Sequence, residues 1–234
     1  MNTIGKLYTL TSFGESHGEA LGGVIDGCPA GFPLSVDEIQ YELDRRRPGQ
    51  SSVTTSRTEE DRVEMLSGVF EGVTTGTPIG FIVRNKDQRS RDYDEIKDLF
   101  RPSHADYTMQ EKYGIWDYRG GGRSSAREHV VRVVGGAVAR QVLKRLGIFI
   151  HGYTSQVGPI VLNKTYHELN LEETDANVVR CPDSVIAREM ELFIRKVQEE
   201  HDSVGGVVSC VIRGVPVGVG EPVFDRFQAR LDIT

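Results

Sequence analysis

The hydrophobic pattern first becomes regular in a short apolar stripe at helical spacing. Ser35 and Glu38 stand at its start with the spacing of a capping box, in which each side chain bonds to the backbone N–H of the other residue. Pro48 and Gly49 follow the stripe, and both residues disfavour continuation of a helix. The pattern therefore predicts a helix from Ser35 to about Arg47.

Two later segments carry the same signal. Ser125 and Glu128 form a second capping box before the most regular apolar stripe of the chain, and Gly147 is placed to end that helix. A third amphipathic stripe runs from Asp183 to Glu200. We therefore predict two further helices. Their apolar faces consist of Val130, Val131, Val134, Ala137, Val138 and Val142 in the first and of Ile186, Met190, Phe193 and Val197 in the second.

Runs of β-branched and other apolar residues between turn residues predict the strands. These strands do not alternate strictly with the helices, which favours an α+β fold with helices packed against antiparallel sheets over a βαβ fold. We find no linker that divides the chain and predict a single domain over residues 1–234. Polar residues 50–62 and the charged, glycine-rich residues 84–123 are predicted to be loops. The predicted strands are 22–26, 66–73, 78–83, 148–157 and 204–213.

Composition narrows the classes of partner. The net charge of −6 and the pI of about 5.6 give no general attraction to nucleic acid or to an anionic membrane. The three cysteines lack CxxC spacing, so we expect buried free thiols and neither a disulfide framework nor a metal site. The first residues lack a signal-peptide core, and no apolar run is long enough to cross a membrane. A cytoplasmic protein is therefore expected.

Two histidines stand in glycine- or proline-containing loops. His17 follows Gly14-Glu15-Ser16, where we expect an exposed ring that can transfer protons, because the ordinary pKa of histidine lies near neutrality. His104 follows Arg101-Pro102-Ser103. In both cases the alternative is a loop histidine that is bonded locally and has no catalytic role.

Basic residues suggest where an anion could bind. Arg45, Arg46 and Arg47 end the first predicted helix, where cations complement the helix dipole. Three successive arginines cannot all share one helix face, so at least one could recognise a phosphate or carboxylate. Both interpretations remain open.

A glycine run from Gly120 to Gly122 leads directly into the second capping box. Arginines, hydroxyls and backbone N–H groups meet there, and helix starts of this kind attract anions. The run matches neither a Walker A loop nor a Rossmann fingerprint. An ordinary capped helix after a turn is the alternative, but together the four segments favour an enzyme that acts on an anionic substrate.

The same segments resemble those of one enzyme family. In order and spacing, the chain is similar to the chorismate synthases, from about residue 3 to about residue 230. The motifs that carry the resemblance are GESHG (14–18), DRRRPGQ (44–50), SGVFEGVTTGTPIG (67–80), NKDQRSRDY (85–93), RPSHADYT (101–108), GGGRSSARE (120–128) and GEPVFDR (220–226).

The resemblance implies a reaction, a fold and an assembly. The expected activity is the conversion of 5-enolpyruvylshikimate 3-phosphate to chorismate by 1,4-anti elimination of phosphate, a step toward the aromatic amino acids. Reduced FMN would be required although the reaction has no net redox change, and NADPH is a possible reductant of the flavin. The implied fold is a β-α-β sandwich, and the implied assembly is a homotetramer.

The resemblance also assigns roles to single residues. His17 matches the family histidine beside the departing phosphate, and His104 matches the histidine near the reduced flavin. Arg46, together with Arg47, falls at the position implied for binding the anionic substrate or NADPH. The implied flavin contacts are Arg123, Ser124 and Ser125.

Some positions depart from the family pattern. Ser52 replaces an arginine, which weakens the case for NADPH, and Ser103 stands where the family commonly has glycine. The family also continues beyond the motif at 220–226 through further flavin-binding loops and a catalytic aspartate. We therefore expect a chain that lacks the family's C-terminal segment. The alternative to an active lyase is a catalytically incomplete fragment that acts only as a structural or assembly core.

Overall fold

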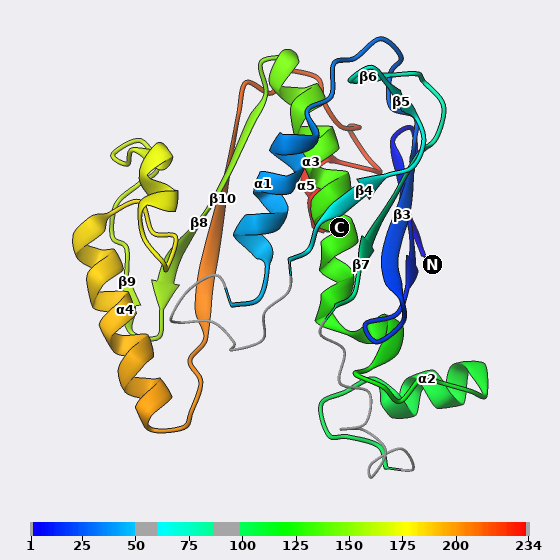
Figure 1. Cartoon of the computed structure of the whole chain (residues 1–234). Helices are drawn as coiled ribbons and strands as arrows, with labels where there is room; N and C mark the ends of the chain where they lie inside the picture. Colours follow the sequence, from blue (N-terminus) through cyan, green and yellow to red (C-terminus); the bar gives the residue numbers. More distant parts are fainter. Residues whose placement is uncertain (1, 50–59, 87–98, 233–234) are drawn as a thin grey trace. The chain divides into compact units, whose positions relative to one another are not determined.

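A computed structural model of the chain describes residues 2–49, 60–86 and 99–232 (Figure 1). The chain divides into two compact units, which are described separately below. The first comprises residues 1–50 and 56–142, and the second comprises residues 51–55 and 143–234. The single-domain organisation stays a prediction.

An antiparallel five-stranded sheet forms the framework of the first unit, with the strand order β1-β2-β3-β7-β4. A separate two-stranded ladder joins β5 to β6. The prediction of strands at 22–26 and 78–83 is confirmed. The strands are β1 Thr3–Gly5, β2 Thr9–Gly14, β3 Ala20–Asp26, β4 Val63–Met65, β5 Val69–Phe70, β6 Val73–Thr74 and β7 Ile79–Arg84.

Helix α1, Val36–Arg46, begins where the capping signal predicts. The Ser35 hydroxyl accepts a hydrogen bond from the Glu38 N–H at 3.2 Å. The Ser35 N–H instead donates to Gln141 Oε1 at 2.8 Å, which ties the helix start to α3. Arg47 is the C-cap, directly before Pro48, so the predicted end is also confirmed.

Helix α3, His129–Arg145, packs closely against the sheet. A Cβ atom added to Gly23 would lie 2.8 Å from Val131 Cγ1, and one added to Gly135 would lie 2.7 Å from Leu10 Cδ2. Small residues at these positions therefore let the helix approach the strands. The core beneath α3 consists of Leu10, Leu21, Ile25, Ile39, Leu43, Ile79, Phe81, Val83, Val130, Val134 and Val138.

Two predictions for the first unit are wrong. The segment 66–73 is not one strand, because Gly68 and Gly72 both have positive φ and break it into short pieces. Residues 84–123 are not loop throughout, since α2, Asp106–Tyr113, lies within them. The apolar signal of α2 is weak because Asp106 is its one buried residue, so periodicity could not reveal it.

The second unit holds an antiparallel three-stranded sheet in the order β10-β8-β9, with α4 beside β8 and β9 (Figure 1). Asp183 caps α4 by accepting hydrogen bonds from Val185 N–H and Ile186 N–H, and the helix lies within the range predicted from its amphipathic pattern. The predicted strands at 148–157 and 204–213 are confirmed. The elements are β8 Phe149–Val157, β9 Ile160–Val161, the 3-10 helix η4 Leu171–Ala176, α4 Ser184–Glu199, β10 Gly206–Arg213 and α5 Phe227–Asp232.

These elements confirm the α+β class, with helices and antiparallel sheets.

Cys28 and Cys181 are buried free thiols, but Cys210 is exposed on β10, which corrects the expectation that all the cysteines are buried. Cys210 lies on β10, an edge strand of its sheet, most of whose residues are exposed. Within the described ranges, no helix is both long and apolar enough to span a membrane.

Candidate active site

His17 lies in the turn that joins β2 to β3, and its side chain is 5% exposed. This burial contradicts the expected exposed ring. The turn is tight, because Gly18 N–H donates to Glu15 O at 3.1 Å. The glycine run around Gly120 covers the ring, which explains why the two flanking glycines do not leave it open to solvent.

The contact between His17 and Gly120 joins two segments that are far apart in the sequence. A Cβ atom at Gly120 would lie 2.0 Å from His17 Nδ1, so only glycine fits here. Gly120 also has a φ of +61°, a conformation that glycine adopts without strain. The backbone of the run also binds the histidine turn, because Ser16 N–H donates to Gly122 O at 3.4 Å.

Ser16 links the histidine ring to the same glycine. Its hydroxyl lies 3.2 Å from His17 Nδ1 and donates to Gly120 O at 3.3 Å. Ser16 is 1% exposed, so this pair of contacts is shielded from water. A buried hydroxyl with both contacts holds the imidazole in one orientation.

Asn85 follows β7, and its side chain holds the histidine turn through hydrogen bonds to two backbone carbonyls. Its amide Nδ2 donates to Glu15 O at 3.1 Å and to Gly18 O at 2.8 Å. Its Oδ1 accepts a hydrogen bond from Arg127 Nε at 2.6 Å. The asparagine therefore connects the His17 turn to the start of α3.

A buried carboxylate holds two arginines beside this connection. Asp61 Oδ1 lies 2.8 Å from Arg127 Nη1, and Asp61 Oδ2 accepts from Arg46 Nη1 at 3.0 Å. Arg46 was predicted to bind an anionic ligand, and the structure places its guanidinium on Asp61 and on Ala126 O. Arg47, predicted with it, is an exposed C-cap residue.

The three predicted flavin contacts lie on one segment. Arg123 directs its guanidinium at Ser12 Oγ, 2.7 Å away, and at Gly14 O, 3.1 Å away. These bonds hold the end of β2, so the side chain serves the framework of the histidine turn. The exposed Ser124 donates its hydroxyl to Gly121 O at 2.7 Å.

Ser125 caps the 3-10 helix η3, Ala126–Glu128, which leads into α3. Its hydroxyl oxygen accepts a hydrogen bond from Arg127 N–H at 3.3 Å. The sequence prediction of a cap at Ser125 is therefore confirmed, although the first turn is 3-10 rather than α-helical. The first-turn position of Arg127 places its guanidinium inside the protein, against Asp61 and Asn85.

His104 lies in the loop before α2, and its ring is exposed. Its Nδ1 lies 3.1 Å from Pro102 O. Ser103 has a φ of +61°, in the left-handed region where glycine is favoured, which agrees with the glycine that the family resemblance implies at this position.

Arg101 and Asp106 fix the shape of the His104 loop. Arg101 Nε and Nη2 donate to the two carboxylate oxygens of Asp106 at 2.7 and 2.9 Å. The hydrogen bonds from Arg101, and to a lesser degree the charge of His104, lower the pKa of Asp106 despite its burial. A Cβ atom at Gly121 would lie 3.7 Å from Arg101 Nη2, so this loop adjoins the glycine run.

A second arginine–carboxylate pair lies near His17. Arg119 donates from Nε and Nη2 to both oxygens of Asp117 at 2.8 Å. The hydrogen bond from Arg119 is the main cause of the lowered pKa of Asp117, and the charge of His17 adds to it. The carboxylate that senses the charge of His17 is therefore already balanced by an arginine.

The structure thus brings His17, the glycine run and Ser125 onto one connected framework, with the His104 loop beside the run through Arg101. Sequence reasoning missed Asn85 and Asp61. Asn85 begins a segment that resembles the family, which could have drawn attention to it. Asp61 lies in a polar run with no periodicity, so nothing local marked it as buried.

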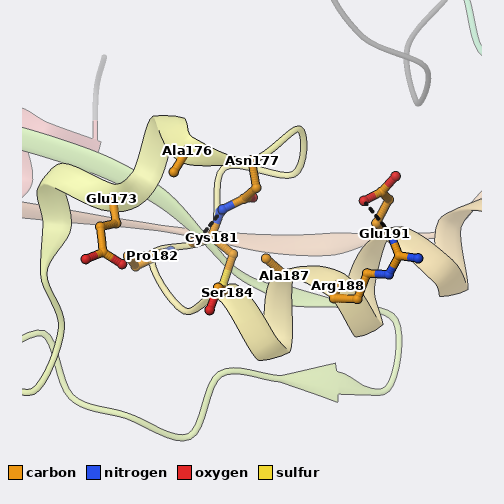
Figure 2. Close-up of a pocket in the computed structure, with 9 residues that line it drawn as sticks. All are labelled: Glu173, Ala176, Asn177, Cys181, Pro182, Ser184, Ala187, Arg188 and Glu191. Carbon is orange, nitrogen blue, oxygen red and sulfur yellow. Dashed lines mark hydrogen bonds and ion pairs between the residues drawn. The ribbon is translucent and has the colours of Figure 1, made fainter.

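The second unit contains a pocket lined by its own residues (Figure 2). Among its lining residues, Asn177 Nδ2 donates to Cys181 O at 2.6 Å, and Arg188 Nη1 lies 3.9 Å from Glu191 Oε2 on α4. None of the predicted site residues lines it. Its lining residues are Glu173, Ala176, Asn177, Cys181, Pro182, Ser184, Ala187, Arg188 and Glu191.

The fold and site define an α+β protein in which a buried histidine turn is held against a glycine run and a helix start whose arginines bind groups of the chain itself. Comparison with known proteins makes the assignment specific. The family model described as chorismate synthase matches residues 8–233. This chain belongs to the chorismate synthase family.

Individual relatives agree with the family assignment. A protein named chorismate synthase from Christiangramia forsetii is 59% identical over 230 residues, and one from Phocaeicola vulgatus is 60% identical over 230 residues. Each match covers 98% of this chain but 64% of the relative. The chain therefore spans about 64% of the length of these relatives.

A solved structure described as "Crystal Structure of Chorismate Synthase" has a similar fold. The comparison gives a TM-score of 0.75 at 31% identity and covers 94% of this chain and 63% of that chain. The fold type expected from the sequence is therefore confirmed.

Proposed function

We propose that this chain takes part in the chorismate synthase reaction, a carbon–oxygen lyase step that converts 5-enolpyruvylshikimate 3-phosphate to chorismate and phosphate. In this 1,4-anti elimination a C–O bond to phosphate and a ring C–H bond break, and a new C=C bond forms. The observation that best supports the proposal is the buried His17 held against Gly120 within the family match.

His17 would protonate the departing phosphate. The Ser16 hydroxyl has one proton, which it gives to Gly120 O, so its oxygen accepts from the Nδ1–H of His17. Nε2 is then the atom that gains and loses the proton during turnover. An imidazolium that donates from Nε2 both neutralises the developing charge and protonates the leaving group.

The Ser125 hydroxyl fits the proposed flavin site, and Ser124, whose proton is donated to Gly121 O, would offer its hydroxyl oxygen there. The oxygen of Ser125 accepts from Arg127 N–H, so its hydroxyl proton can be donated to a flavin oxygen. Arg123 would support this segment from behind through Ser12 and Gly14 O. Ser124 and Ser125 would hold the reduced FMN, whose chemistry would be transient electron donation and help in accepting the ring proton. His104 would adjust the protonation of that flavin.

Further parts of the proposal rest on the family resemblance alone. If NADPH reduces the flavin, it would bind the exposed Arg47. Arg46 is less suited to this role, because its guanidinium is held by the buried Asp61. Ser52, the other position relevant to NADPH, lies outside the described residues. A homotetramer that binds a small phosphorylated substrate completes the proposal.

The test uses an extended chain, which joins residues 1–234 to the part of the Christiangramia forsetii relative that the match does not cover. The measurement is anaerobic formation of chorismate and phosphate with reduced FMN and 5-enolpyruvylshikimate 3-phosphate. We expect turnover that His17→Ala lowers by about 100-fold or more, as expected for loss of a general acid. His167→Ala, which alters an exposed histidine of the second unit, is the matched control and should retain full activity.

The outcomes separate the possible roles. Turnover by the extended chain but not by residues 1–234 would mean that these residues alone are a structural core. Absence of chorismate formation in the extended chain, with FMN bound, would contradict the proposed activity. Equal activity of His17→Ala and His167→Ala would contradict the role of His17.

A further inference from the structure

We propose that Asn85 is a positioning residue that sets the orientation of His17. The expected effect of Asn85 on turnover rests on the proposed function, but its expected effect on the orientation of the His17 ring does not. Asn85 is the first residue after β7, and its side chain is buried. Its backbone N–H donates to Glu19 O at 3.0 Å, which fixes it beside the turn that carries His17.

The amide of Asn85 closes that turn. Its Nδ2 donates to the carbonyls of Glu15 and Gly18, which lie on either side of Ser16 and His17. Both N–H bonds of the amide are therefore used to fix the two ends of the segment that carries the imidazole. A displacement of either carbonyl would move the ring relative to Gly120, against which it is packed without a gap.

Arg127 determines which way the amide faces. A guanidinium has only donors, so the atom of Asn85 that lies 2.6 Å from Arg127 Nε must be the carbonyl oxygen. The NH₂ group then faces the two backbone carbonyls, which only accept. In this orientation each contact of the Asn85 side chain pairs a donor with an acceptor. A reversed amide would place donor against donor at Arg127 and acceptor against acceptor at the two carbonyls.

Asp61 fixes the arginine in turn. Its carboxylate lies 2.8 Å from Arg127 Nη1, and both side chains are almost fully buried. The chain Asp61–Arg127–Asn85 therefore ends at the backbone of the His17 turn. The positioning of the catalytic imidazole depends on residues that need not touch the substrate.

Asn85→Asp tests this assignment because it preserves size and the contact with Arg127 but replaces the two N–H donors with an acceptor. Asn177→Asp is the matched control. Asn177 also donates from Nδ2 to a backbone carbonyl within a turn, that of Cys181, but it lies in the second unit. Each variant loses the hydrogen bonds that its side-chain amide donates to backbone carbonyls of a turn. Only Asn85→Asp loses them at the turn that carries His17.

Two measurements are made on each variant. The first is the 1H–13C spectrum of the six labelled histidine rings of the chain, with the His17 signal assigned by its loss in His17→Gln. The second is the kcat of the extended chain together with its dissociation constant for FMN. We expect Asn85→Asp to shift or broaden the His17 signal selectively. It should lower kcat by about 10- to 100-fold at unchanged FMN affinity, as a misplaced catalytic group does.

The results have distinct meanings. A His17 signal and a kcat that match those of Asn177→Asp would overturn the proposal. If Asn85→Asp does not fold, Asn85→Ser, whose hydroxyl keeps one donor, is measured in the same way, and an unchanged His17 signal and kcat there would overturn it as well. If the unaltered extended chain forms no chorismate, the proposed function fails, and the His17 signal still decides the positioning role.

Discussion

The imidazole of His17 lies so close to Gly120 that a single added carbon would overlap it. A Cβ atom at Gly120 would be 2.0 Å from Nδ1 and 2.1 Å from Cε1 of the ring. This contact joins the turn after β2 to the glycine run before α3, although the two residues are 103 positions apart in the sequence. The run is therefore part of the wall that holds the histidine.

Gly120→Ala should displace the His17 ring and remove most of the activity of the extended chain. Gly114→Ala is the control, because Gly114 also has positive φ but has nothing within 4 Å of an added Cβ. Each substitution pays a backbone cost of roughly 1–2 kcal/mol, and only the first adds a clash. Measured chorismate formation should fall in Gly120→Ala alone. If the two variants form chorismate at equal rates, displacement of the His17 ring does not affect activity, which would contradict the prediction.

Asp61→Asn should reduce stability strongly, because it leaves two arginines without their shared buried carboxylate. Breaking a buried ion pair from one side costs about 3–5 kcal/mol. Chemical unfolding of residues 1–234 measures the loss. Glu60→Gln is the neighbouring control, since Glu60 pairs with Lys86 on the surface and its removal should leave the unfolding midpoint unchanged. Similar midpoints for the two variants would contradict the structural role of Asp61.

The capped helices and the regular strands could be predicted because their signals are local. Ser35 caps α1 at the predicted position, α4 lies within the predicted helix from Asp183 to Glu200, and β3 follows directly from a run of apolar and small residues. The burial of His17 could not be predicted, because it results from contact with Gly120. Similarly, nothing near Asp61 in the sequence reveals the arginines that surround it.

The roles of single residues also divide into those with a local sequence signal and those that depend on contacts between distant segments. The glycine run and Ser125 were recognised as a helix start from local pattern alone, and the cap at Ser125 is present. The use of Arg123 to hold Ser12 and Gly14 is a long-range contact that the sequence does not encode in any spacing. Contacts between distant segments therefore account for most of what the sequence did not reveal about the site.

Ser125→Ala should weaken the helix start and loosen flavin binding. Loss of the cap to Arg127 N–H is expected to cost about 1 kcal/mol. Ser35→Ala removes the equivalent cap of α1 and should cost a similar amount without altering FMN affinity. Thermal unfolding and FMN titration of both variants separate the two effects. An unchanged FMN dissociation constant in Ser125→Ala would remove Ser125 from the proposed flavin site.

The Arg101–Asp106 pair predicts a pH dependence. Hydrogen bonds from Arg101 hold the pKa of Asp106 below its ordinary value of 3.8 in the folded state. The stabilisation is therefore complete above that value and is lost as the pH falls through the folded-state pKa. The difference in urea midpoint between the unaltered chain and Asp106→Asn should be present at about pH 6 and shrink toward about pH 2.5. An undiminished difference in acid would contradict this pairing.

The most direct test of the account asks whether His17, His104 and the segment from Gly120 to Ser125 form one binding site. NMR titration of the extended chain with FMN and 5-enolpyruvylshikimate 3-phosphate follows the rings of both histidines and the backbone amides of that segment. The account predicts that all of these signals shift together at the same ligand concentrations. Shifts confined to one of the three groups, or spread over unrelated parts of the chain, would contradict a shared site.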